Sequence, residues 1–175
     1  MKRDSGKYFG LILMVGFGAI AIFRWHQTHL IFFLLLALRD FLAGYFFMKR
    51  TPAKLKAGHL VSIMSYVSTA MPLIYLPPTV DIKALLLASD LLAIVGFSIV
   101  TLATIELGTS LGISPAQREY VSSGIYKWIK HPMYLGYGIA ELGLAMINPI
   151  NISIWVMSSS LYFWRKRTEQ NLLVG

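Results

Sequence analysis

Long apolar runs separated by short polar segments dominate the sequence. Six runs can be traced, at residues 8–23, 29–48, 60–76, 82–107, 133–147 and 152–164. A helix needs about 20 residues to cross a bilayer, and the last two runs are short by that measure. The pattern therefore predicts an all-α, polytopic membrane helical bundle of about six spans, whose last two helices form a short hairpin around Asn148-Pro149-Ile150-Asn151.

Polar and proline-containing segments mark where these helices end. Arg24-Trp25-His26 closes the first run with a charge and an interfacial aromatic residue, and Pro77-Pro78 closes the third. The sequence predicts a single integral-membrane domain over 1–175. Its N-terminal helices occupy 1–105, and residues 106–175 hold a polar loop, the helical hairpin and a C-terminal tail.

The composition supports a membrane protein. The 175 residues are 56% apolar and 14% charged, whereas soluble domains carry about 25% charged residues. The absence of cysteine excludes disulfides and thiolate metal sites. The net charge is +8, but the basic residues lie between apolar runs and are not clustered on a soluble module, so we expect no nucleic-acid partner. The sequence also contains no GxGxxG or P-loop motif, which excludes a soluble Rossmann-type cofactor domain.

The distribution of basic residues predicts the topology. If the N-terminus, the 49–59 loop, the 106–132 loop and the C-terminus share one side, that side holds 13 of the 16 Lys and Arg residues. The opposite loops hold only Arg24 and Lys83. Because basic loops stay in the cytoplasm, we expect both termini and the site to face the cytoplasm. The expected location is a bacterial or archaeal inner membrane.

Several ionisable residues interrupt the apolar runs. Arg39-Asp40, Asp90 and Glu141 are costly at membrane depth, so they indicate either structural ion pairs or a functional polar path. Glu141 has two readings, a partner of Arg39 or a protonated group among polar neighbours. Three glycines of the fifth run, Gly136, Gly138 and Gly143, favour close helix packing.

The segment 124–136 is the strongest candidate for chemistry. Pro132 suits the first turn of a helix, which places His131 at the positive helix end near the membrane surface. Because the 148–151 turn is short, the last two helices must be antiparallel neighbours, and His131 and Arg165 then meet at one depth.

Arg165 and Glu169 are spaced i, i+4 and share a helix face. From spacing alone, a solvated salt bridge or a contact with anionic lipid is the commoner explanation of this pair. The tyrosines Tyr126, Tyr134 and Tyr137, with Trp128, also suit an interfacial aromatic belt.

Two motifs in order resemble a known family. The first comprises Leu107-Gly108, Gly112-Ile113-Ser114-Pro115, Arg118 and the run from Val121 to Gly136, which contains His131-Pro132-Met133-Tyr134-Leu135-Gly136. The second is the tail from Arg165 to Leu173. Together, over roughly 105–175, they resemble the isoprenylcysteine carboxyl methyltransferase family, which is close to the phospholipid methyltransferases.

The resemblance implies a membrane methyltransferase that uses S-adenosylmethionine and a lipid-like or prenylated acceptor, most of all a carboxylate of the isoprenylcysteine type. Arg165 would face that acceptor as the catalytic and substrate-binding residue. The implied cofactor contacts are Tyr126, His131, Pro132, Met133, Tyr134 and Glu169, with backbone around Arg118, Glu119, Tyr120 and Val121.

The residue types agree with this chemistry. Aromatic faces attract a sulfonium cation, and the Glu169 carboxylate can accept hydrogen bonds from ribose hydroxyls or an ammonium group. A carboxylate acceptor is already ionised and needs no general base. It needs positioning, which the planar guanidinium of Arg165 can supply, so the rate would come mainly from alignment.

Three positions depart from the family pattern. Gln170 stands where a second acid is usual, and Lys130 stands where Arg is commoner. The resemblance implies that the tail forms a lid over the cofactor, and the chain ends at Gly175 without an acidic and aromatic tail, so we expect a looser lid. Two other functions stay open, a membrane reductase of related fold and a non-catalytic or degenerate protein such as a small carrier. The sequence predicts no particular acceptor and no oligomeric state.

Overall fold

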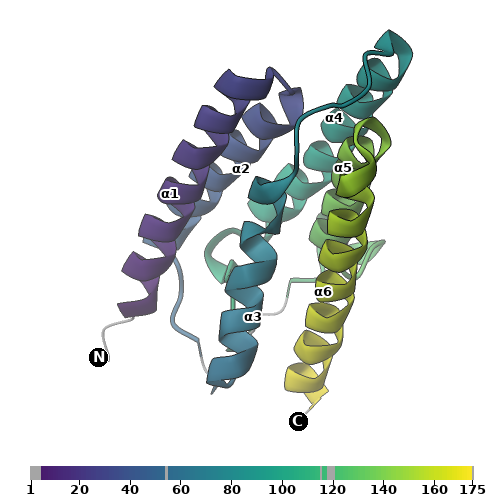
Figure 1. Ribbon diagram of the computed structural model, residues 1–175. Helices are drawn as coiled ribbons and strands as arrows, with labels where there is room; N and C mark the ends of the chain where they lie inside the picture. The colour runs from purple at the N-terminus through teal and green to yellow at the C-terminus, as the bar shows by residue number, and fades with distance from the viewer. Residues whose placement is uncertain (1–4, 54, 115, 118–120, 175) are drawn as a thin grey trace.

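The computed structural model describes residues 5–53, 55–114, 116–117 and 121–174 (Figure 1). Its regular structure is helical apart from two strands of two residues each, which confirms the all-α class. Six α-helices follow one another: α1 (Ser5–Thr28), α2 (Ile31–Met48), α3 (His59–Ala70), α4 (Lys83–Leu107), α5 (Pro132–Ile147) and α6 (Pro149–Val174). Shorter elements are the 3₁₀ helices η1 (Met71–Ile74), η2 (Gly108–Ser110) and η3 (Gly124–Lys127), and the antiparallel strands β1 (Leu55–Lys56) and β2 (Ala116–Gln117).

Within the described residues, three helical stretches are long and apolar enough to cross a membrane: Gly6–Thr28, Ile31–Met48 and Lys83–Ser110. Large apolar side chains are exposed on these helices, including Ile12, Phe23 and Leu87. A soluble protein rarely leaves such broad apolar surfaces in water. The helices therefore indicate a multi-pass membrane protein.

The third apolar run is not a continuous helix, contrary to the span expected over 60–76. The α-helix α3 ends at Ala70, η1 continues it to Ile74, and the chain is extended from Tyr75. Pro72 lies at the start of η1 and has no N–H with which to continue the α3 hydrogen-bond ladder.

Side chains from the α5–α6 junction satisfy the backbone of this extended segment. Asn151 accepts a hydrogen bond from the Leu76 N–H at 2.8 Å and donates to the Leu76 and Leu144 carbonyls, each at 3.0 Å. Asn148 donates to the Pro77 carbonyl at 2.7 Å, and Arg24 of α1 donates to the Tyr75 carbonyl. Non-helical backbone inside a membrane protein needs such internal partners.

The hairpin of α5 and α6 packs beside α4 (Figure 1). A single residue, Asn148, separates α5 from α6. A Cβ at Gly136 would lie 2.6 Å from the Gly96 carbonyl oxygen, and one at Gly143 would lie 2.7 Å from the Ser89 carbonyl oxygen. These two glycines therefore let α5 approach α4 closely, as the sequence suggested. Gly138 differs, because a Cβ there would meet nothing within 4 Å. With 26 residues, α6 continues beyond the apolar run of 152–164 through Arg165 and Glu169, as the sequence predicted.

The intramembrane ionisable residues have protein partners. Arg39 donates to Asp40 at 2.7 Å, and both are buried, which confirms the structural ion pair. Glu141 does not bond Arg39; it accepts hydrogen bonds from Tyr75 at 2.9 Å and from Tyr162 at 2.5 Å. Of the two readings of Glu141, a position among polar neighbours is therefore the one observed.

We expect Asn151→Ala to destabilise the fold. The substitution leaves one N–H and two carbonyl groups without their partner, which should lower the free energy of unfolding by about 2–4 kcal/mol. Thermal unfolding in detergent micelles measures the effect. Ser160→Ala on the same helix is the control, because Ser160 is exposed and bonds only the Val156 carbonyl of its own helix. Equal melting temperatures for the two variants would contradict this role of Asn151.

Candidate active site

The site begins at the N-terminus of α5. Pro132 occupies the first turn, where its missing N–H costs no hydrogen bond, and His131 is the N-cap residue with non-helical backbone. His131 thus lies at the positive end of the helix dipole. The η3 turn precedes it, joined by Trp128 to Lys130.

Glu169 of α6 meets this helix start. Tyr134, in the first turn of α5, donates its hydroxyl hydrogen bond to Oε1 of Glu169, and Oε2 lies 3.7 Å from Nδ1 of His131. The Gln170 amide nitrogen lies 3.5 Å from Nε2 of His131. The continuous helix and the one-residue turn at Asn148 bring these groups together, as the hairpin argument predicted.

Arg165 lies one turn before Glu169 and is buried. Its guanidinium carbon lies 5.3 Å from the centre of the Tyr134 ring. One terminal nitrogen donates to Ser68 at 3.1 Å and to Thr69 at 3.3 Å, and the other donates to the Ile113 carbonyl at 2.7 Å. Its Nε is buried and has no hydrogen-bond partner among the described residues. Arg165 therefore ties α6 to α3 and to the segment after η2, and keeps its Nε–H uncommitted.

Glu106, near the end of α4, holds the η3 turn. Its two carboxylate oxygens lie 3.0 and 2.8 Å from the Ile125 backbone nitrogen and accept its hydrogen bond. The preceding Gly124 has a φ of +53°, which side chains disfavour, and any Cβ there would collide with the Glu106 carboxylate. The positive φ and the carboxylate beside it therefore both favour glycine at position 124.

Burial shifts the pKa values of three titratable groups of the site. Burial, and then the charges of Lys166 and Lys130, lower the pKa of His131 below its ordinary value, so the imidazole is mostly neutral at pH 7. Burial raises the pKa of Glu169, and Arg165 and the Tyr134 hydroxyl oppose this effect. Burial also raises the pKa of Tyr126, and the charges of Glu169 and Glu106 add to it.

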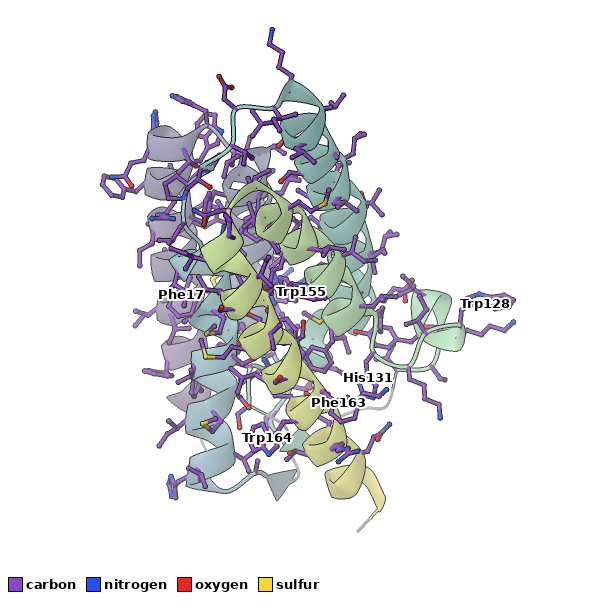
Figure 2. The ribbon with its side chains drawn as sticks, turned by 45° about the vertical axis from the view of Figure 1, so that its right-hand side comes forward. Phe17, Trp128, His131, Trp155, Phe163 and Trp164 are labelled. Carbon is purple, nitrogen blue, oxygen red and sulfur yellow. The ribbon has the colours of Figure 1, made fainter. Side chains whose placement is uncertain are left out.

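A cleft of about 520 Å³ opens beside these groups, between the η3–α5 connection and α6. Figure 2 shows Trp128 projecting away from the helices, while His131 and Phe163 lie close together on the α5–α6 flank. Lys130 and Lys166 also line the cleft, and the other lining residues are Ile129, Tyr134, Leu135, Gly138, Ser159 and Tyr162.

The structure assembles much of the predicted site. Electrostatic or direct contacts bring together Tyr126, His131, Tyr134, Arg165 and Glu169. Pro132 is buried at the start of α5, Met133 packs against both hydrophobic clusters, and Val121 is half-buried before η3. The other three predicted positions, Arg118, Glu119 and Tyr120, lie outside the described residues.

Sequence reasoning missed three kinds of supporting residue. Glu106 left a signal, because an acid near a helix C-terminus is unfavourable for the dipole and indicates another partner. Ser68 and Thr69 left none, since hydroxyls are common in apolar helices. Tyr162 looked like an ordinary aromatic residue of an apolar run, and its role depends on contacts with α5.

We expect Glu106→Ala to loosen η3. The Ile125 N–H loses a charge-assisted acceptor, so its hydrogen–deuterium exchange should accelerate by about tenfold or more. Glu106→Gln keeps an acceptor oxygen and should show a smaller effect. Unchanged exchange at Ile125 in the alanine variant would contradict the capping role.

Comparison with known proteins assigns the family. The sequence profile of the isoprenylcysteine carboxyl methyltransferase (ICMT) family matches residues 84–174, just over half of the chain. No curated protein and no solved structure matches this chain. The matched region contains α5, α6 and the cluster around Tyr134 and Glu169. Family membership implies a membrane methyltransferase that uses S-adenosylmethionine. The chain belongs to the isoprenylcysteine carboxyl methyltransferase family.

Proposed function

We propose that this protein transfers a methyl group from S-adenosylmethionine to the carboxylate of a lipid-like acceptor of the isoprenylcysteine type. One observation supports the proposal most strongly. Tyr134 lies at the meeting point of Glu169, which accepts its hydrogen bond, and Arg165, whose cation lies over its ring. A hydrogen-bond acceptor for the polar cofactor and a cation for an anionic methyl acceptor thus lie on either side of one aromatic residue.

The residues present suit the cofactor. S-adenosylmethionine supplies a methyl group activated by a sulfonium cation. Tyr134 and Tyr126 offer aromatic faces that attract a cation, and Glu169 offers carboxylate oxygens to hydroxyl or ammonium donors. His131 and Gln170 add further polar atoms beside Glu169. Neutral His131 can accept as well as donate a hydrogen bond, which its lowered pKa favours near pH 7.

Arg165 is the proposed contact for the acceptor. Its uncommitted, buried Nε can donate to a carboxylate oxygen, while Ser68, Thr69 and the Ile113 carbonyl hold the guanidinium plane in place. An ionised carboxylate needs no base, so the contribution of Arg165 is to bind and orient it. Burial of this cation makes an anionic partner favourable.

The orientation in the membrane follows from the bundle and the charges. Figure 1 shows the two chain ends at the same end of the bundle, and that arrangement agrees with the basic termini and loops of the sequence. We propose about six passes through a bacterial or archaeal inner membrane, with both termini and the site on the cytoplasmic side.

The cleft beside α5 and α6 is the proposed place for the acceptor chain. Leu135 and Phe163 give it an apolar lining, while Lys130 and Lys166 lie where an anionic head group would be attracted. Gly138 supplies open space on the α5 side. A volume of about 520 Å³ lies within the range of small-molecule sites.

Binding of S-adenosylmethionine to detergent-purified protein is the first test. We expect calorimetry to detect binding, and Glu169→Gln to weaken it about tenfold or more, since the hydrogen bonds that residue 169 accepts from the cofactor lose their charge assistance. Lys127→Gln is the control, because it also removes one charge but lies exposed on η3. Absence of binding by the unaltered protein would overturn the proposal, and equal affinity in Glu169→Gln would remove Glu169 from the site.

Gly138→Leu tests the acceptor cleft. The larger side chain should fill the cleft, raise the KM for a prenylated N-acetylcysteine about tenfold and leave the affinity for S-adenosylmethionine unchanged, because a lost apolar contact of this size is worth roughly 1–3 kcal/mol. Gly16→Leu on α1 is the matched control, since a Cβ there also meets nothing within 4 Å.

Radiolabelled methyl transfer measures the KM for the acceptor lipid and the affinity for S-adenosylmethionine. The same lipid with an amide in place of the carboxylate should accept no methyl group. If Gly138→Leu weakens cofactor binding instead, the cleft belongs to the cofactor. Transfer to the amide lipid would contradict a carboxylate acceptor.

A further inference from the structure

Four rings stack in sequence from the membrane surface into the bundle. The His131 and Tyr134 rings lie 5.8 Å apart at 20°, Tyr134 and Tyr162 lie 5.7 Å apart at 13°, and Tyr162 and Tyr137 lie 5.8 Å apart at 26°. We call these four residues the ring stack. Near-parallel rings at these separations attract one another beyond simple burial, so each ring restrains the plane of its neighbour.

The inner part of the ring stack is anchored by polar contacts. Tyr162 donates to Oε1 of Glu141 at 2.5 Å, and Glu141 is fully buried. Arg39, paired with Asp40, lies 5.2 Å from the centre of the Tyr137 ring. Buried hydrogen bonds are costly to break because a lone partner is left without water. The plane of the Tyr162 ring is therefore set from inside the membrane by Glu141, which lies two turns of α5 away from Tyr134.

We propose that Tyr162 and Glu141 are positioning residues that hold Tyr134 in the orientation that the cofactor site requires. Neither needs to touch a ligand for this role. Glu141 fixes the hydroxyl of Tyr162, Tyr162 fixes the ring plane of Tyr134, and Tyr134 presents its hydroxyl to Glu169. The inference rests on the proposed cofactor site, and it explains why an acid is kept at full burial in an apolar helix.

Tyr75 provides a matched control within the same cluster. It donates to the other oxygen of Glu141 at 2.9 Å and is also fully buried, but its ring packs against Phe32. Tyr75→Phe and Tyr162→Phe each remove one phenol hydrogen bond from Glu141. Only Tyr162→Phe frees a ring that stacks on Tyr134. A purely structural role therefore predicts equal effects of the two variants on the affinity for S-adenosylmethionine, and a positioning role predicts different effects.

The decisive experiment compares these two variants by melting temperature and by affinity for S-adenosylmethionine. We expect similar losses of melting temperature, but a rise in the dissociation constant of about threefold to tenfold only in Tyr162→Phe, the size of effect that ring contacts contribute. Glu141→Gln keeps an acceptor oxygen for Tyr162 and should retain most of the affinity. Equal dissociation constants for Tyr75→Phe and Tyr162→Phe would overturn the proposal.

A second readout needs no cofactor. In protein labelled with 3-fluorotyrosine, the ¹⁹F resonance of Tyr134, assigned by its loss in Tyr134→Phe, reports the environment and motion of that ring. Tyr162→Phe should shift or broaden this resonance, and Tyr75→Phe should leave it unchanged. If the unaltered protein binds no S-adenosylmethionine, the proposed function fails, but this spectrum still decides whether Glu141 and Tyr162 orient Tyr134. An unchanged resonance in Tyr162→Phe would refute the positioning role.

Discussion

The short connection between α5 and α6 is the constraint on which the site depends. With only Asn148 between them, the two helices must run antiparallel and in contact from the turn onward. The start of α5 therefore meets the far part of α6, where Arg165 and Glu169 project one turn apart. The same junction supplies Asn148 and Asn151, whose amides satisfy the extended backbone after η1. One tight turn thus organises both the polar site and the irregular segment of the bundle.

Much of this arrangement could be predicted from the sequence because it follows from local rules. The run expected over 82–107 is α4, Lys83–Leu107, since hydropathy alone determines such a helix. Pro132 marked the start of α5, and the i, i+4 spacing of Arg165 and Glu169 placed both on one face. The family motifs then added which residue types we expect in the candidate site.

Other features depended on contacts between elements that are distant in sequence. The extended backbone at Tyr75 and Leu76 is stable only because Asn151, 75 residues beyond Leu76, pairs with it. Glu106 caps a turn 19 residues away, and Tyr162 acquires a role only when α6 lies against Tyr134. No periodicity in a single segment encodes such partners. Arg165 shows the same limit, because spacing predicted its face but not its bonds to Ser68 and Thr69.

The Glu169 carboxylate has a thermodynamic consequence for ligand recognition. One oxygen already accepts from Tyr134 and the other lies near His131. Each carboxylate oxygen has a second lone pair, so a ligand hydroxyl at the proposed site would share Glu169 with the Tyr134 hydroxyl rather than displace it. The net free energy of that added hydrogen bond is small, because the ligand gives up a hydrogen bond to water. Affinity at the proposed site should therefore come mainly from shape and from the rest of the ligand, while Glu169 would discriminate against molecules that offer it no donor.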